Sequence, residues 1–245
     1  MISFAPGPVA VPDLRVRIGF EALADKIRTS SARPGLIDAA RAVFETHRDT
    51  WEPAMTYQWL GFTPGSTGES GTIAPMARPE AGTGEVELRL GHSGRFLSNA
   101  RYVLAAVYTA GPRLDAAAAE AGKNNDFLDA HFLDLLGLIV LEQAEQAVKD
   151  LASEKAAEAG WGVSPFLSPG SVHGWELSEQ KKLAGLLPIS DIRVSISDAA
   201  VFSPFKTISC IIGIGPAYED TRVGSTCQVC AKRDHCQMKT SLKHE

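Results

Sequence analysis

The stretch DFLDAHFLDLLGLIVLEQAEQAVKDLASEKAAEAG, residues 126–160, decides the fold expected for this chain. Apolar residues recur from Phe127 to Val140 and then give way to alternating charge, which predicts one long helix from about Asp126 to Ala159. Gly160 is a typical stop signal for such a helix. Gly137 lies inside the apolar part, and we expect the helix to break once there.

Strands are expected both before and after this helix in the sequence. Residues 86–90 and 192–196 alternate apolar and polar side chains, and TISCIIGIG (207–215) places apolar side chains on one face. Shorter helices are expected at 20–29, 34–47, 112–122 and 178–187, and Ser98 is expected to cap a helix that leads into VLAAVYTAG (103–111). The Gly/Pro-rich residues 63–85 are expected to be irregular. The pattern predicts an α+β domain with a twisted, largely antiparallel sheet, flanked by helices that include one long central helix.

Composition narrows the class of protein. The 245 residues are 44% hydrophobic and 22% charged, with a formal net charge of −5. No overall basic field therefore favours nucleic acid or an anionic membrane as partner. The longest apolar run is too short to cross a membrane. The N-terminal residues lack the pattern of a secretory signal peptide, so we expect the protein to be cytoplasmic.

Three cysteines are close together in TCQVCAKRDHCQMK, residues 226–239. Cys227, Cys230 and Cys236 have the spacing C-x2-C-x5-C, which fits zinc, an iron–sulfur cluster or a redox thiol pair. Cys210 would complete the usual set of four cluster ligands, but a small buried thiol is also an ordinary filler of a core strand. His235 or an iron left open toward a partner are the alternatives for the fourth ligand.

Glu142 and Glu145 lie one helical turn apart in the long helix. Such a pair could face a polar pocket as two acids. The alternative is that both belong to the solvent-exposed edge of an amphipathic helix.

Four segments carry a family resemblance: VLAAVYTAGPRLD (103–115), LDLLGLIVLEQAEQAV (133–148), SPGSVHGWELSEQKKLAGLL (168–187) and ISDAAVFSPFKTISCIIGIG (196–215). In this order the chain resembles the reactivation domain of cobalamin-dependent methionine synthase and related corrinoid-activation proteins. The resemblance implies a helmet-like single domain. It has an activation-domain-like core at 85–215, N-terminal helices and a Gly/Pro-rich loop at 1–84 that belong to the same domain, and a cysteine-containing metal-binding tail at 216–245.

The resemblance also implies a function. Such a domain docks on a corrinoid-binding methyltransferase module and helps to return the module's cob(II)alamin to the methyl-accepting state. That reduction needs an electron at low potential, which an iron–sulfur cluster can carry and zinc cannot. We therefore expect a 4Fe-4S cluster in the tail, fed by a low-potential electron donor. The alternatives are a non-redox corrinoid-binding module with structural zinc, and an enzyme that acts on an unrelated substrate.

The family binds S-adenosylmethionine through an Arg-x-x-x-Gly-Tyr element, and the matching residues here are FLSPGS (166–171). Phe166 stands in place of the Arg and Ser171 in place of the Tyr, while Gly170 is kept. A phenyl ring cannot hold a carboxylate as a guanidinium does, which counts against S-adenosylmethionine binding in the family's manner. We expect Gly170, Ser171, His173 and Trp175 to form the edge of a cofactor-binding pocket, with an ordinary turn and local packing as the alternatives.

Overall fold

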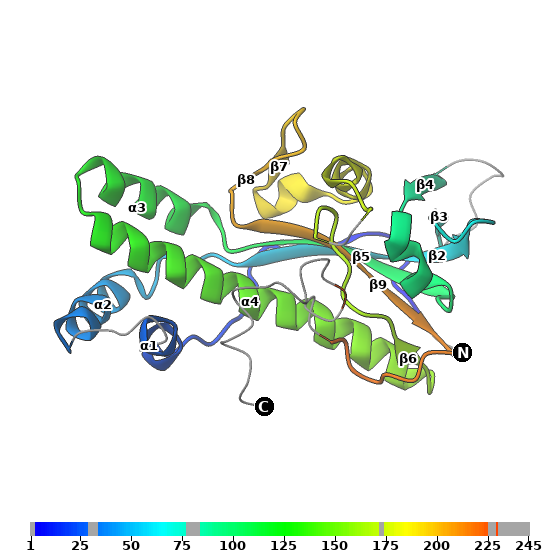
Figure 1. Ribbon diagram of the computed structural model, residues 1–245, viewed down its shortest axis with the longest axis horizontal. Coiled ribbons are helices and arrows are strands. Elements are labelled where there is room, and N and C mark those ends of the chain that lie inside the picture. Colours follow the sequence, from blue (N-terminus) through cyan, green and yellow to red (C-terminus); the bar gives the residue numbers. More distant parts are fainter. Residues whose placement is uncertain (1–2, 29–33, 77–83, 172–173, 225–228, 230–245) are drawn as a thin grey trace.

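The computed structural model describes residues 3–28, 34–76, 84–171, 174–224 and Val229. Its main sheet is antiparallel throughout, in the order β4-β3-β2-β5-β9-β6, with β1 also paired to β2 (Figure 1). The strands of this sheet are β1 (Val9–Val11), β2 (Ala54–Pro64), β3 (Ser70–Pro75), β4 (Val86–Arg89), β5 (Tyr102–Thr109), β6 (Gly162–Val163) and β9 (Thr207–Gly215). A separate hairpin pairs β7 (Ser195–Ile196) with β8 (Phe202–Ser203).

Helices cover both faces of the sheet. The longest, α4 (Phe127–Glu158), runs along one face (Figure 1) and shares a core with α1 (Phe20–Arg28), α2 (Pro34–His47) and α3 (Pro112–Lys123). The elements that follow β4 and β6 are the 3-10 helices η1 (Gly91–Leu97), η2 (Leu177–Glu179) and η3 (Ile189–Ile192) and the short helix α5 (Gln180–Gly185). The predicted α+β class with a mostly antiparallel sheet is confirmed.

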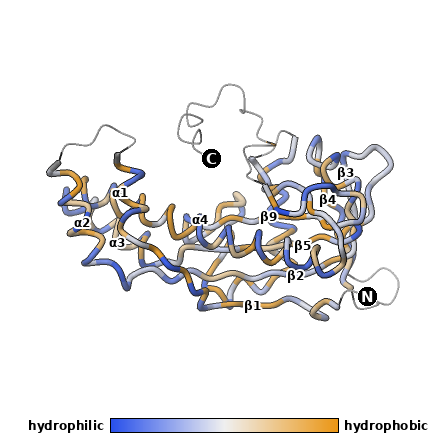
Figure 2. The backbone as a smooth tube through the Cα atoms, turned by 90° about the horizontal axis from the view of Figure 1, so that it is seen from below, coloured by the Kyte–Doolittle hydropathy of each residue, from blue (hydrophilic) through white to orange (hydrophobic). Residues whose placement is uncertain are grey.

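Alternation along the central strands divides their buried side chains between the two faces of the sheet. Successive strand residues point to opposite faces. Cys210 and Ile212 of β9 therefore join the core under α4, whereas Ile211 joins a second core with Leu183 of α5 and Trp175. In Figure 2 the central strands are coloured largely as hydrophobic, as expected for strands buried on both faces.

The long helix is confirmed, but the predicted break at Gly137 is wrong. The helix continues through Gly137, and the missing side chain there leaves room for a neighbour, because an added Cβ would collide with Cδ and Cε of Lys206. The glycine is therefore a contact point between α4 and the chain just before β9.

Three other predictions need correction. No α-helix begins at Ser98, and the apolar run 103–111 supplies the central strand β5, because a strand buried on both faces loses its alternation. The segment 63–85 contains β3 and follows the long strand β2, neither of which was predicted. The segment 192–196 is strand only at Ser195–Ile196, because Arg193 adopts a left-handed backbone with φ of 57°.

None of the helices in the described ranges combines the length and the hydropathy that a membrane crossing requires.

Candidate functional site

The outer edge of β9 opens into a pocket. On one side β9 pairs with β5 over most of its length. On its other side, among the described residues, it pairs only with β6 and, through Ile211, with Leu167. Beyond that bridge lies a pocket of about 330 Å³, called here the β9 pocket. It is lined by Glu145, Phe166, Ser168, Pro169, Ser171, Leu177, Gln180, Ala200, Val201, Phe202, Phe205, Thr207, Ile208 and Ser209.

The turn at Gly170 forms one wall of the β9 pocket, and its backbone amides are already used. Gly170 has φ of 79°, and its N–H donates to the carbonyl of Trp175 at 2.9 Å. The N–H of Ser171 donates to the carbonyl of Ser168 at 3.1 Å. These two amides therefore hold the turn closed and are not free to bind an anionic ligand.

The four predicted pocket residues are placed differently from one another. Ser171 lines the β9 pocket, and Gly170 shapes the turn beside it. Trp175 is 2% exposed and packs in the second core, so its indole fills the interior, which was the alternative considered for it. His173 lies outside the described residues.

Phe166, which aligns with the arginine of the Arg-x-x-x-Gly-Tyr element, is part of the core. Its side chain is 1% exposed, its ring meets the ring of Tyr108 edge-on, and Nζ of Lys149 lies 5.5 Å from its centroid. Lys149 in turn pairs with Glu145, with Nζ and Oε1 2.6 Å apart. A cation is thus present near this position, but it is held by an aromatic face and a carboxylate.

Glu145 is the only charged side chain among the described residues that line the β9 pocket. Its Oε2 accepts a hydrogen bond of 3.0 Å from the Tyr108 hydroxyl. Burial and the nearby Glu145 carboxylate raise the pKa of Tyr108 well above its ordinary value, so this hydroxyl remains a donor. The other predicted acid, Glu142, pairs with Lys26 at 2.7 Å. Of the two glutamates, one faces the pocket and the other forms a surface ion pair.

The cysteines lie in two parts of the chain. Cys210 is fully buried under α4, where burial and then Glu145 raise the pKa of its thiol well above the ordinary value. Cys227, Cys230 and Cys236 lie outside the described residues, as does His235. Val229, between two of these cysteines in sequence, is described and is buried in the second core, on the opposite side of the sheet from Cys210. Within the described ranges no group of three or more His, Cys, Asp or Glu residues is placed to hold a metal ion.

An exposed apolar rim borders the β9 pocket. Leu177 and Val201 are nearly half exposed, and Phe205, at the loop between β8 and β9, is 79% exposed. Side chains of this kind on one rim of a pocket are typical of a contact surface. The sequence analysis did not single out any of these three residues. An apolar residue has the same sequence signature whether its side chain is exposed or buried, as the Phe in SPFK (203–206) illustrates.

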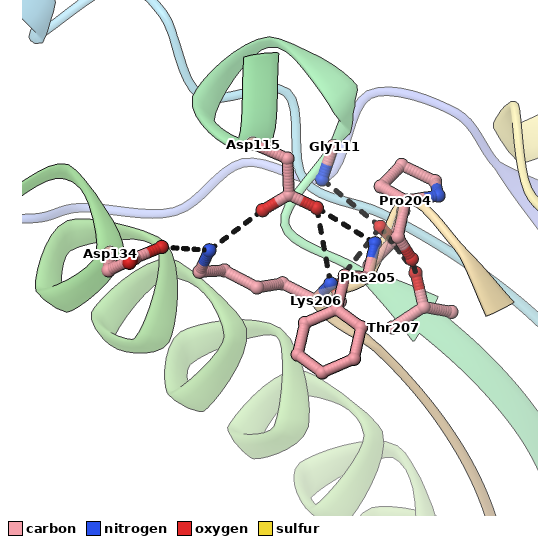
Figure 3. Close-up of polar contacts among 8 residues, drawn as sticks. Gly111, Asp115, Asp134, Pro204, Phe205, Lys206 and Thr207 are labelled. Atoms are coloured by element: carbon pink, nitrogen blue, oxygen red, sulfur yellow. Dashed lines mark hydrogen bonds and ion pairs between the residues drawn. The ribbon is translucent and has the colours of Figure 1, made fainter. Parts of the chain in front are cut away.

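The loop that carries Phe205 is held rigidly by charged groups (Figure 3). Asp115 of α3 accepts hydrogen bonds from the backbone N–H of Phe205 at 2.8 Å and of Lys206 at 3.3 Å. Nζ of Lys206 lies 2.7 Å from Asp115 Oδ1 and 2.8 Å from Asp134 Oδ1 of α4. Burial alone would lower the pKa of Lys206, but the hydrogen bonds to Asp115 and Asp134 raise it above 10.5. The ammonium thus ties two helices to the loop.

Comparison with known proteins identifies the fold. No model of a protein family and no curated protein matches this sequence. A solved structure described as the MetH reactivation domain bound to AdoHcy superposes with a TM-score of 0.58 at 13% sequence identity, covering 98% of this chain and 87% of that one. The fold is that of the MetH reactivation domain. Almost the whole chain therefore has the reactivation-domain fold, including β1 to β3, which precede the segments that carry the sequence resemblance.

Proposed function

We propose that this chain is a reactivation component for a corrinoid protein that carries out methyl transfer. The observation that carries the proposal is the likeness to the MetH reactivation domain over 98% of the chain. The exposed rim beside the β9 pocket adds a surface on which a partner can dock. Binding there would favour the partner conformation that exposes its corrin, which is how a docking domain drives a conformational change.

The rim is suited to a large, partly apolar partner surface. The backbone of the loop that carries Phe205 is held by Asp115 and Lys206, so little backbone conformational entropy is lost when the ring becomes buried. Aromatic residues held in this way are the usual anchors of interfaces. We infer that the corrin-bearing face of the partner contacts Phe205, Val201 and Leu177.

The second part of the proposal concerns the cysteine-containing tail. A 4Fe-4S cluster held by Cys227, Cys230 and Cys236 would, when bound, supply the one electron that converts cob(II)alamin on the partner to cob(I)alamin, and a low-potential donor would restore that electron. Val229, which is bonded to Cys230, is itself described and is buried in the second core.

Cys210 is poorly placed to be the fourth ligand of the proposed cluster. Cys210 makes the cysteine count four, but its side chain lies in the core under α4 while Val229 packs on the other side of the sheet. Burial also favours the protonated thiol there, whereas a cluster ligand must be a thiolate. These positions favour the alternatives, His235 or an iron left open toward the partner.

Metal analysis of anaerobically purified protein tests the cluster. We expect iron and sulfide, a brown colour, and their loss in Cys230→Ala. Cys210→Ala is the matched control, which should keep the cluster and lose about 1 kcal/mol of stability from its core position. Colourless protein with stoichiometric zinc would instead support the non-redox module, and loss of iron in Cys210→Ala would establish Cys210 as the fourth ligand.

Docking is tested separately from the cluster. Immobilised protein should retain the cobalamin-binding module of a methionine synthase in its cob(II)alamin state, and Phe205→Ser should abolish retention without changing the iron content. Equal retention of the module by both proteins would remove the rim from the proposal.

S-adenosylmethionine has no evident anchor for its carboxylate in the β9 pocket. The described lining residues include no cation, the amides of Gly170 and Ser171 are used, and Phe166 is buried. We infer that reactivation by this chain ends with the reduction and leaves methylation to another donor. Equilibrium dialysis should show S-adenosylhomocysteine and 5′-methylthioadenosine, which lacks the amino-acid group, bound equally weakly. A preference for S-adenosylhomocysteine by about tenfold or more would reveal a carboxylate anchor.

A further inference from the structure

A second pocket lies on the other side of Phe205. It has a volume of about 650 Å³, lies between the first turn of α3 and the β7–β8 hairpin, and is called here the hairpin pocket. It is lined by Pro112, Asp115, Ala116, Ser190, Arg193, Val194, Ser195, Ser203, Pro204 and Phe205. Phe205 is the only lining residue that it shares with the β9 pocket among the described parts of the chain.

Arg193, the basic residue that lines this pocket, has hydrogen-bond donors to spare. Nη1 of Arg193 lies 3.1 Å from Oε1 of Glu52, and Nη1 of Arg113 lies 3.8 Å from the same oxygen. Two guanidinium groups therefore share one carboxylate, which leaves an excess of one positive charge. Because a guanidinium has five N–H donors, Arg193 can bind Glu52 and still present donors to a ligand.

Asp115, the acidic residue that lines this pocket, is already occupied by donors from within the protein. Asp115 accepts from the backbone amides of Phe205 and Lys206 and from the Lys206 ammonium. Its charge is thereby largely offset within the protein. Asp134, the other partner of Lys206, belongs to α4 and does not line the pocket. Its side chain is largely exposed to solvent, where its field is screened.

Two hydroxyl groups complete the set of donors. Ser195 and Ser203 are paired directly across the β7–β8 hairpin, and both line the pocket. Neither hydroxyl hydrogen-bonds to another side chain or backbone group in the described part of the chain. Apolar lining from Pro112, Val194 and Phe205 offers contact to a carbon framework.

We propose that the hairpin pocket binds a small organic phosphate, with Arg193 and the Ser195–Ser203 pair holding the phosphate group. A guanidinium with adjacent hydroxyls matches the several acceptor oxygens of a phosphate, and the pocket is larger than the phosphate alone requires. The residues that hold the phosphate group are separate from the proposed docking rim, because none of these three residues lines the β9 pocket; Phe205 alone is shared by the two pockets in the described part of the chain.

Titration of the full chain with phenyl phosphate at neutral pH, followed by amide NMR shifts and calorimetry, tests the proposal. We expect shifts centred on Arg193, Ser195 and Ser203, and tighter binding of phenyl phosphate than of phenol. Arg193→Gln should weaken binding by about tenfold or more, because a charge-assisted hydrogen bond is lost. Ser195→Ala should weaken it by a smaller factor.

Arg113→Gln is the matched control. It removes the other guanidinium that pairs with Glu52, but Arg113 is not itself one of the residues that line the pocket. It should therefore retain binding within about threefold, because the Arg113 side chain is not part of the lining and is largely exposed to solvent, which screens its charge. Thermal melting without ligand checks that each variant is folded. The proposal is overturned by equal losses in Arg193→Gln and Arg113→Gln, by shifts scattered over the surface, or by the absence of saturable binding.

Discussion

The two pockets on either side of Phe205 differ in the charge that faces the ligand. The β9 pocket presents the carboxylate of Glu145, while the hairpin pocket presents the guanidinium of Arg193. Both are built partly from residues 200–209, yet the charge of each comes from elsewhere, from α4 in one and from the turn after η3 in the other. The chemistry of each pocket is therefore set by distant elements that meet at one loop.

Removing the Lys206 ammonium, which holds the loop that carries Phe205, should have the largest effect on the free energy of unfolding. Lys206→Met leaves Asp115 and Asp134 without their cation, and Asp134 is partly solvated. We expect a loss of about 2–3 kcal/mol in the free energy of unfolding, measured by urea denaturation. Lys181→Met, which removes an exposed pair with Asp198, is the control. It should change stability only slightly, as surface substitutions usually do. Similar effects of the two substitutions would contradict a rigid loop.

The same ammonium should make stability depend on alkaline pH. Because the pKa of Lys206 in the folded state is raised above 10.5, its contribution is complete below pH 10.5 and is lost as the pH rises through the folded-state pKa. Burial also raises the pKa of Tyr108, Tyr218 and Cys210, which adds pH-dependent changes common to every variant. The difference between wild type and Lys206→Met should therefore shrink above pH 10.5, and a constant difference would reject the pairing.

The contact between α4 and Lys206 can be tested from the helix. An alanine in place of glycine inside a helix normally gains about 1 kcal/mol. Gly137→Ala should instead lose about 1 kcal/mol, because the added Cβ meets Lys206 while that side chain is held by two carboxylates. Gly122→Ala in α3 is the control, since nothing lies within 4 Å of its added Cβ, and it should be stabilising. A gain at both sites would show that Lys206 moves away freely.

Changing Phe205, which lines both pockets, should have the smallest effect on stability. The Phe205 ring is largely exposed, so Phe205→Ala should leave the free energy of unfolding nearly unchanged in urea denaturation. It should nevertheless weaken both phenyl phosphate and partner binding, and Phe205→Leu should keep part of each. A large fall in thermal stability would mean that the ring packs within the protein.

Elements with a clear period were predictable from the sequence. The alternation around Val86 and Ile208 and the helical pattern after Phe127 correspond to β4, β9 and α4. The prediction failed at β5, because burial on both faces removes the alternation of apolar and polar residues. It also failed at Gly137, where the glycine marks a close contact with Lys206 and not a break in the helix. A single left-handed residue, Arg193, shortened the strand expected around it.

The sites were less predictable than the fold. The departure from the Arg-x-x-x-Gly-Tyr pattern could be read from the sequence at Phe166, but the use of the Gly170 and Ser171 amides depends on hydrogen bonds that only the folded turn reveals. Similarly, Arg193 and Ser203 are ordinary residues in sequence. They line the same pocket because η3 and the β7–β8 hairpin bring them to the first turn of α3.

The order of strands has a consequence for how this protein can be made. In the sheet, β9 lies between β5 and β6, and β2, from the N-terminal part of the chain, lies on the other side of β5. The sheet cannot be completed until β9 has emerged from the ribosome, so the edge of β5 that pairs with β9 stays uncovered while the residues between these two strands are being synthesised. A fragment that begins after β3 and ends with β9 would lack β2 and should aggregate rather than fold.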